Sequence, residues 1–275
     1  MESNALKTLL IGFGDLAQRL QSLLPGELVA IRRSPRPERF CRQLDATDAS
    51  AMRALLAEDF DQIVVTLTPS ERCDAGYQRA YVAPMRLLVS LLAERQLRPR
   101  ILFVSSTAVY GQDQGQWLDE TSATEPTQYN GVRLLEAEQV LLNAGLDVIV
   151  ARFSGIYGPG RERLLEQVRQ GLPISRNLLA FSNRIHVDDG ARALAHLLRL
   201  TAPESHYLVT DSEPVLLGEV VRGLANALQR PAPSSTAGAP FSGKRLRNTR
   251  LLASGFRFLY PSWREGYGLD KLEPS

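Results

Sequence analysis

Short runs of apolar residues alternate along the first half of the chain with longer segments in which apolar positions recur at helical spacing. The apolar runs predict strands at residues 8–11, 27–31, 62–67, 100–105 and 147–152. The helical spacing predicts helices at about residues 15–23, 50–57, 76–95 and 131–143. Strands separated by helices form βαβ units, so the pattern predicts an α/β fold with a doubly wound parallel sheet.

The pattern loosens after residue 153. A helix is predicted near 162–170, a short strand at 184–187, a strand at 206–209 and a helix at 217–228. Asp188 and Asp189 suit the N-cap and first turn of a helix that follows the strand at 184–187. Within the first half, Pro84 lies inside the helix predicted at 76–95, where proline kinks or divides a helix.

The first predicted strand leads directly into Gly12-Phe-Gly-Asp-Leu-Ala17, which opens the first predicted helix. In this pattern Gly12 allows a tight turn, Gly14 lets the backbone approach a pyrophosphate, and the small Ala17 lets helix and strand pack closely. Glycines also end strands for steric reasons alone. The position between an N-terminal strand and a helix nevertheless favours dinucleotide binding.

The second predicted strand ends in Ile31-Arg-Arg-Ser34, where an NAD-binding strand would end in a carboxylate that accepts from the ribose 2′-hydroxyl. Guanidinium groups bind a 2′-phosphate bidentately, so Arg32 and Arg33 favour NADP over NAD. The alternative is an ordinary solvated basic loop. Asp45, just before the next helix, can accept from an adenine amino group or cap that helix.

Composition excludes several classes of protein. Apolar residues make up 44% and charged residues 23%, which excludes a disordered, collagenous or coiled-coil chain. The net charge of +2 argues against a dedicated nucleic-acid binder. Cys41 and Cys73 are too few for a disulfide framework and lack metal-ligand spacing, so no metal site is expected. No apolar stretch is long enough to span a membrane, and we expect a cytoplasmic protein.

Lysine is nearly absent from the chain. Of the 32 basic residues only Lys7, Lys244 and Lys271 are lysines. A compositional bias explains this shortage most simply. Its consequence is that any mechanism requiring a lysine between residues 8 and 243 is excluded.

Several motifs in order along the chain carry a family resemblance. They are Ser105-Ser-Thr-Ala-Val-Tyr-Gly111, Tyr129-Asn-Gly-Val-Arg133, Arg152-Phe-Ser-Gly-Ile-Tyr-Gly-Pro-Gly160, Asn183-Arg-Ile-His-Val-Asp-Asp189 and Tyr260-Pro-Ser-Trp-Arg-Glu-Gly266. Together with residues 12–17, called the glycine loop below, these motifs make nearly the whole chain resemble the extended short-chain dehydrogenase/reductase family. Within that family the chain is most similar to the NAD(P)-dependent epimerase/dehydratase group, which acts on nucleotide sugars.

The resemblance implies a Rossmann-like NAD(P)-binding domain over residues 1–153. It implies a small substrate-binding region over 154–275, with segments near 184–210 returning to the sheet domain. It also implies a small-molecule substrate and a homodimer. The cofactor-binding residues expected from the motifs and the resemblance together are Gly12, Phe13, Gly14, Asp15, Leu16, Arg32, Arg33, Asp45, Leu67, Thr68, Ser105 and Phe153.

The family's chemistry needs a Ser or Thr hydroxyl, a Tyr that exchanges a proton, and a Lys four residues after the Tyr that holds the nicotinamide ribose and stabilises phenolate. Ser106 matches the hydroxyl position, with Thr107 as the alternative, and Tyr129 with Arg133 has the spacing of the pair. Arg is not a conservative replacement for Lys. A second register, which fits the downstream sequence better, places Asn130 and Leu134 at the two positions and removes the pair.

Two functional hypotheses follow. The first is an NADP-linked oxidoreductase or epimerase-like enzyme acting on a nucleotide sugar or a related hydroxylated small molecule, with Ser106, Tyr129 and Arg133 as catalytic residues. The alternative is a dinucleotide-binding regulatory or structural protein that has lost catalysis. Nucleic-acid binding through the arginines between residues 32 and 42 is a third and weaker hypothesis, because no basic stripe extends beyond them.

Overall fold

The computed structural model describes residues 6–234 and 240–272. The chain forms two compact units. The sheet unit comprises the described residues up to Gly111 together with Thr124–Arg152 and Ala191–Tyr207. The second unit comprises Gln112–Ala123, Phe153–Gly190 and the described residues from Leu208 onward.

The chain does not pass from one unit to the other at a single residue. Gln112–Ala123 belongs to the second unit, although it lies within the predicted first domain. The physical reason is that strand β6 (Gln114–Leu118) pairs in parallel with β13 (Gly243–Leu246), more than a hundred residues farther along the chain. Neither strand is long or apolar enough to be recognised in the sequence.

The main sheet of the described residues has seven strands in the order β11-β7-β5-β4-β1-β2-β3. The printed pairings of β1 with β2 and β4, of β2 with β3, and of β4 with β5 are parallel. This arrangement confirms the predicted Rossmann-like doubly wound α/β fold. The strands are β1 (Lys7–Ile11), β2 (Glu27–Arg32), β3 (Cys41–Gln43), β4 (Gln62–Val65), β5 (Arg100–Ser106), β7 (Val148–Phe153) and β11 (His206–Val209).

The direction in which strands are added reverses beside β1. After β1 the chain builds β2 and β3 on one side, and then crosses to place β4 and β5 on the other. In open sheets of this kind ligands bind outside the carboxyl ends of the strands, at the point of reversal. The fold therefore directs attention to the residues that follow β1 and β4.

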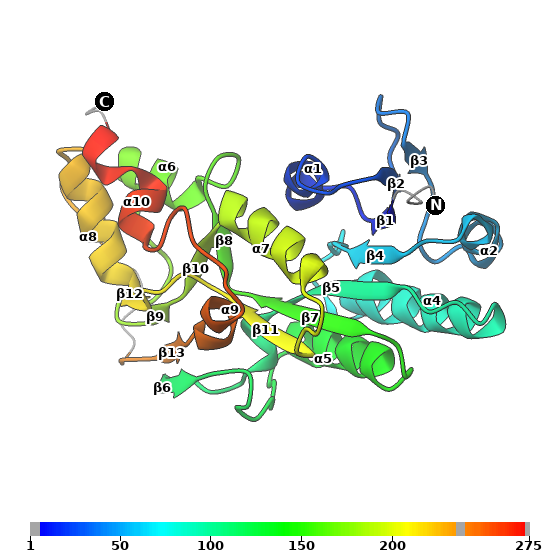
Figure 1. Ribbon diagram of the computed structural model, residues 1–275. Coiled ribbons are helices and arrows are strands. Elements are labelled where there is room, and N and C mark those ends of the chain that lie inside the picture. The colour runs from blue at the N-terminus through cyan, green and yellow to red at the C-terminus, as the bar shows by residue number, and fades with distance from the viewer. Residues whose placement is uncertain (1–5, 235–239, 273–275) are drawn as a thin grey trace. The chain divides into compact units, whose positions relative to one another are not determined.

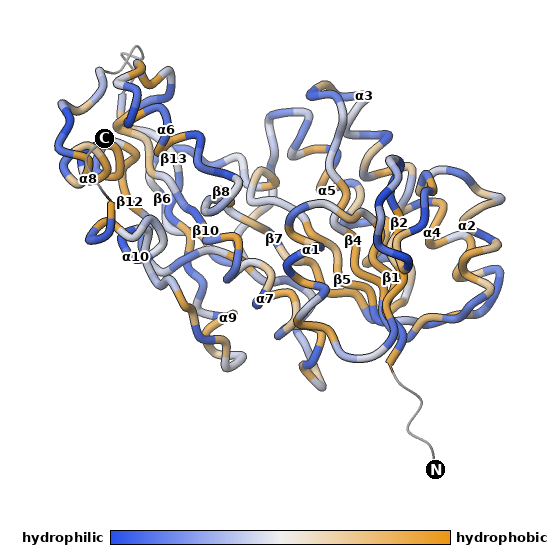
Figure 2. Tube along the Cα trace, turned by 90° about the horizontal axis from the view of Figure 1, so that it is seen from above, coloured by the Kyte–Doolittle hydropathy of each residue, from blue (hydrophilic) through white to orange (hydrophobic). Residues whose placement is uncertain are grey.

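Helices cover the sheet on both faces, and each central strand accordingly contains a continuous run of apolar residues (Figures 1 and 2). Helices α4 and α5 pack against each other on one face, and α1 lies on the other (Figure 1). The helical segments of this unit are α1 (Asp15–Gln21), α2 (Ala49–Leu55), η1 (Leu56–Glu58), α3 (Asp74–Tyr77), η2 (Gln78–Val82), α4 (Ala83–Glu94), η3 (Thr107–Val109), α5 (Tyr129–Leu142) and the end of α7 (Val187–Arg199).

The single helix predicted at 76–95 is divided into three segments. A short α3 passes into the five-residue π-helical segment η2, and α4 begins after it with Pro84 in its first turn. Proline has no backbone N–H to donate to the preceding turn, so it is accommodated where a helix begins. The predicted division at Pro84 is confirmed.

The second unit is built from short pairs of strands and small helices around its own core. Helices α6 and α8 pack together there with Trp263. Its elements are β6 and β13, β8 (Gly155–Tyr157), α6 (Arg163–Arg169), β9 (Phe181–Ser182), β10 (Arg184–His186), the start of α7, β12 (Val215–Leu216), α8 (Leu217–Ala227), α9 (Thr249–Ala253), α10 (Trp263–Tyr267) and η4 (Leu269–Lys271).

Three of the sequence motifs meet inside this unit. The ring of Tyr157 lies edge-on to His186, with ring centroids 5.5 Å apart. The carboxylate of Asp189 accepts from the backbone N–H groups of Leu259 and Tyr260 at 2.9 and 2.8 Å. These contacts fasten the closing motif to the unit and give the motifs a structural role. None of the helices in the described part of the chain is long and apolar enough to span a bilayer.

Candidate functional site

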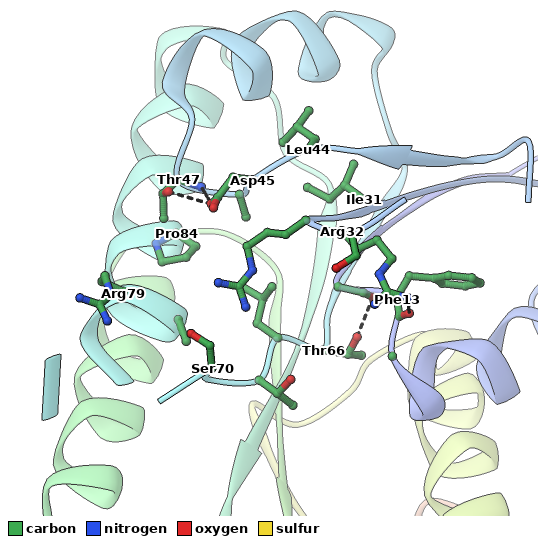
Figure 3. Close-up of a pocket in the computed structure, with 18 of the residues that line it drawn as sticks. Phe13, Ile31, Arg32, Leu44, Asp45, Thr47, Thr66, Ser70, Arg79 and Pro84 are labelled. Atoms are coloured by element: carbon green, nitrogen blue, oxygen red, sulfur yellow. Dashed lines mark hydrogen bonds between the residues drawn. The ribbon is translucent and has the colours of Figure 1, made fainter. Parts of the chain in front are cut away.

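A cavity of about 400 Å³ opens in the sheet unit, at the carboxyl ends of β1, β2 and β4 (Figure 3). It lies where the order of strands reverses. Its lining residues are Gly12, Phe13, Gly14, Ile31, Arg32, Arg33, Ser34, Leu44, Asp45, Ala46, Thr47, Thr66, Leu67, Thr68, Ser70, Gly76, Arg79, Ala80, Ala83 and Pro84. This volume is within the range of cofactor sites.

The glycine loop forms the floor of the cavity. Gly12 has φ +94°, and a Cβ built on it would lie 3.0 Å from the carbonyl carbon of Thr66. Its N–H donates to the carbonyl of Ile31 at 3.0 Å, and its carbonyl accepts from the hydroxyl of Thr66 at 2.8 Å. These constraints require glycine at position 12. A Cβ on Gly14, in contrast, would meet nothing within 4 Å, so the backbone there is open to a ligand.

The end of β2 supplies guanidinium groups to a second wall. Arg32 and Arg33 both line the cavity, and Ser34 follows them. A guanidinium nitrogen of Arg32 lies 3.5 Å from the carbonyl oxygen of Phe13, while Arg33 is exposed to solvent. The lining residues of β2 and its following turn include no carboxylate. This is the charge pattern that suits a phosphate at the ribose 2′ position.

Asp45 lines the cavity and does not cap the next helix. Its carboxylate accepts from the N–H and the hydroxyl of Thr47 at 2.9 and 2.7 Å (Figure 3). The bond from the Thr47 N–H is the main cause that lowers the pKa of Asp45 below its ordinary value. Helix α2 is capped by Asp48, which accepts from the N–H of Ala51. The capping alternative for Asp45 is therefore wrong.

The cavity brings together most of the residues predicted to bind the cofactor. Those that line it are Gly12, Phe13, Gly14, Arg32, Arg33, Asp45, Leu67 and Thr68. Four predicted residues are not in this lining. Asp15 pairs with Arg19 one turn along α1, and Leu16 is buried in the core. Ser105 donates to Glu138, and Phe153 belongs to the second unit. Their cofactor contacts stay predictions.

One wall of the cavity was not predicted. It consists of residues from the turn after β4 and from the start of the divided helix, namely Ser70, Gly76, Arg79, Ala80, Ala83 and Pro84. The helical pattern placed most of these positions within one long helix, where no motif marks them. The only signal in the sequence was Pro84, which indicated that the helix is interrupted close to the cavity.

A buried polar network lies beside the carboxyl ends of β5 and β7. The guanidinium of Arg152 donates to both carboxylate oxygens of Glu138, at 2.7 Å for the shortest bond, and to the hydroxyl of Tyr110 at 2.8 Å. The hydroxyl of Ser105 donates to the same carboxylate. All four side chains are buried, so the network fixes α5 against the two strands.

The three predicted catalytic residues lie in separate environments. Ser106 ends β5, and its hydroxyl accepts from the N–H of Ala108 at 3.2 Å. Tyr129 begins α5, and its hydroxyl donates to the carbonyl of Arg72 at 2.6 Å. Arg133 donates two hydrogen bonds of 2.8 Å to Asp74.

These contacts engage both members of the predicted Tyr–Arg pair. Arg133 donates a further bond to Glu136 at 2.7 Å, and hydrogen bonds to Asp74 and Glu136 raise the pKa of its guanidinium. Its charge is thus directed at two carboxylates. The catalytic roles of Tyr129 and Arg133 stay predictions.

The second register of the motif lies on another face of α5. Leu134 is buried, whereas Asn130 is half-buried. Gly131 approaches the turn after Ser106 so closely that a Cβ on it would lie 2.2 Å from the carbonyl oxygen of Ala108. In this register an apolar residue occupies the position of the lysine, so no cation is supplied there. Among residues 6–234 and 240–272, no group of three or more His, Cys, Asp or Glu side chains could hold a metal ion.

Comparison with known proteins agrees with the fold. A profile of the NAD dependent epimerase/dehydratase family matches residues 14–209. Protein YeeZ of Escherichia coli strain K12 is 31% identical over 234 residues, which cover 82% of this chain and 78% of that protein.

Solved structures give the same result. A Methylobacillus flagellatus protein named for the NAD-dependent epimerase/dehydratases is 34% identical, with a TM-score of 0.81 and 96% of each chain covered. MoeE5, solved with UDP-glucuronic acid and NAD, has a TM-score of 0.82 over 96% of this chain and 97% of its own, at 21% identity, and shows the fold alone. From the family profile and its relatives, the chain belongs to the NAD dependent epimerase/dehydratase family.

Proposed function

We propose that the chain binds NADP in the cavity of the sheet unit, in preference to NAD. The observation that carries this proposal is the wall at the end of β2, where Arg32 and Arg33 line the cavity without an accompanying carboxylate. A carboxylate at this place accepts from a ribose hydroxyl and repels a phosphate, whereas guanidinium groups attract a phosphate and donate hydrogen bonds to it.

The remaining lining residues fit the other parts of the dinucleotide. The open backbone at Gly14 leaves room for the diphosphate, because even a methyl group there would meet no neighbour. Asp45 and Ala46 also line the cavity, and the carboxylate of Asp45 can accept from the adenine amino group. When bound, NADP supplies hydride transfer to or from its nicotinamide ring.

For the reaction, we propose oxidoreduction or epimerisation of a hydroxylated small molecule, with nucleotide sugars as the substrate class. Family membership and the binding of UDP-glucuronic acid by MoeE5 support this class. Ser106 ends the central strand β5 at the edge of the sheet where ligands bind in such folds, so it is the proposed residue that holds the substrate oxygen.

Tyr129 remains the proposed proton-exchanging residue, with Arg133 as its partner. The test is turnover of UDP-glucose or UDP-glucuronic acid with NADP, in the natural chain and in Tyr129→Phe. Loss of a general acid or base lowers turnover by roughly 10²–10⁴-fold. Turnover that is unchanged in Tyr129→Phe would remove this residue from the mechanism.

A second candidate function is dinucleotide binding without catalysis. The specific observation in its favour is that neither register of the motif provides a free cation, because Arg133 is bonded to Asp74 and Glu136 and Leu134 is apolar. This candidate predicts tight cofactor binding, with neither a change in nicotinamide absorbance nor an epimerised product when sugars are added. Measurable turnover of any hydroxylated substrate would exclude it.

The first experiment is a fluorescence titration with NADPH and NADH. We expect the natural chain to bind NADPH at least tenfold more tightly, the effect of roughly one charge-assisted hydrogen bond. Preferential binding of NADH would overturn the assignment to Arg32 and Arg33. Binding of neither would overturn the proposed function.

A further inference from the structure

The wall of the cavity formed by residues 70–84 carries one charged side chain. Its other lining residues, Ser70, Gly76, Ala80, Ala83 and Pro84, are small and leave open space. Arg79 is the single long side chain among them, and it lies across the cavity from Phe13 (Figure 3). A guanidinium on an otherwise small wall is suited to a ligand that fills the space beside it.

The backbone that carries Arg79 is unusual. Arg79 lies in the π-helical segment η2, between the short α3 and the Pro84-containing α4. Single π turns within helices are uncommon and occur frequently at functional sites. Here the π segment contributes both Arg79 and Ala80 to the lining of the cavity.

The counter-ion of Arg79 is Glu71, and the pair is exposed to solvent. A guanidinium nitrogen lies 2.7 Å from a carboxylate oxygen of Glu71, and the two side chains are 62% and 61% exposed. Exposed pairs of this kind contribute little stability and are screened by salt. The backbone of Glu71 lies close to Gly76, where a Cβ would be 2.3 Å from the Glu71 carbonyl oxygen.

The charge of the lining residues indicates the ligand. Three arginines and one aspartate line the cavity, and the carboxylate of Asp45 is bonded to Thr47. Guanidinium groups bind phosphate oxygens bidentately and strongly. We propose that Arg79 is a third phosphate-binding residue of this site, which leaves Glu71 and binds a phosphate of the dinucleotide. This inference rests on the proposed function, since it needs a dinucleotide in the cavity.

The phosphate can be the diphosphate bridge or the 2′-phosphate, and titration with two cofactors distinguishes them. In Arg79→Ala, we expect the affinity for NADPH to fall about tenfold to 100-fold, the range for a charge-assisted bond. An equal fall for NADH assigns Arg79 to the diphosphate, whereas a fall for NADPH alone assigns it to the 2′-phosphate. Arg79→Lys keeps the charge and should recover part of the loss.

Glu71→Gln removes the competing carboxylate, so it should raise the affinity a few-fold without adding a contact to the cavity. Arg53→Ala is the matched control. Arg53 also makes an exposed pair, with Glu94 at 2.9 Å, but neither residue lines the cavity. The Arg53→Ala variant should bind both cofactors with the same affinity as the natural chain.

The inference fails if Arg79→Ala, folded by circular dichroism, binds both cofactors as tightly as the natural chain does. If Arg33→Ala still lowers NADPH affinity in that case, the proposed function stands without this residue. A natural chain that binds neither cofactor overturns both proposals.

Discussion

Gly12 and Gly14 are separated by one residue, yet the structure constrains them in opposite ways. Gly12 has a positive φ and backbone neighbours that a Cβ would contact at 3.0 Å. Gly14 has an ordinary extended conformation and open space around it. The first glycine is therefore required by the fold, and the second is required only if a ligand occupies the space beside it.

Substituting the two glycines separates the requirement of the fold from the requirement of the ligand. Gly12→Ala should lower the free energy of unfolding by about 1–3 kcal/mol, because an alanine is strained at this φ. Gly14→Ala should change it by less than about 0.5 kcal/mol but should weaken NADPH binding, since its methyl group enters the space proposed for the diphosphate. Urea denaturation followed by circular dichroism, with NADPH titration, measures both effects. Undiminished binding by Gly14→Ala would show that the diphosphate lies elsewhere.

The charges at the end of β2 allow a second prediction for single residues. Arg33→Ala should lower NADPH affinity about tenfold or more, because one charge-assisted bond to the 2′-phosphate is lost, and should leave NADH affinity nearly unchanged. The difference between the two cofactors should also shrink as salt is added, since Arg33 is exposed. A fall of equal size for NADH would place Arg33 on a group common to both cofactors.

At the scale of the element, α5 shows why the sequence left two registers open. Successive residues of a helix are rotated by about 100°, so a shift of one position moves the motif to another face. Tyr129 and Arg133 face Arg72 and Asp74, whereas Leu134 and Glu138 are buried. The spacing of the motif favours the first register and the downstream sequence fits the second, so the sequence alone does not choose between them, because only packing decides which face is buried.

The Glu138–Arg152 pair on the buried face of α5 leads to a prediction about stability. Glu138→Gln leaves the Arg152 guanidinium buried without its counter-ion, which should lower the free energy of unfolding by about 3–5 kcal/mol. Glu94→Gln, in an exposed pair, is the control and should have little effect. Denaturation followed by circular dichroism compares them. A small effect of Glu138→Gln would show that solvent reaches the pair.

Much of the sheet unit could be predicted because most of its strands contain a continuous run of apolar residues. Short elements could not: β3 has three residues and β9 two, too few for a periodic pattern. In the site, the glycine loop and Arg32 were recognisable because they follow a strand directly in the sequence. Arg79 was not, since only the π segment after the β4 turn brings it to the cavity.

At the scale of the whole molecule, the two units can be observed separately. Both tryptophans, Trp117 and Trp263, belong to the second unit, so their fluorescence reports on its unfolding. The NADPH titration reports on the sheet unit in the same sample. Substitutions in one unit can thus be tested for effects confined to that unit.

The second unit contains a buried carboxylate that should make its stability depend on pH. Asp211 is 1% exposed; one of its oxygens accepts from the N–H of Glu213 at 3.2 Å, and the other has no hydrogen-bond partner in the described structure. Burial raises its pKa to about 8 from the ordinary value of 3.8. The hydrogen bond from the Glu213 N–H and the charge of Arg184 oppose this rise in pKa, while the carboxylate charges of Glu213 and Glu265 add to it.

The sign of the effect follows from proton binding. Between pH 4 and 8 the folded unit keeps the proton of Asp211 that the unfolded chain has released, so the free energy of unfolding falls as pH rises through this window. The slope should be up to about 1.4 kcal/mol per pH unit. Asp211→Asn should make this slope less steep, and Asp119→Asn, at a half-buried turn of the same unit, should leave the slope unchanged. Urea denaturation followed by tryptophan fluorescence at pH 5, 6.5 and 8 makes the comparison. Equal slopes in all three chains would mean that Asp211 is ionised in the folded unit.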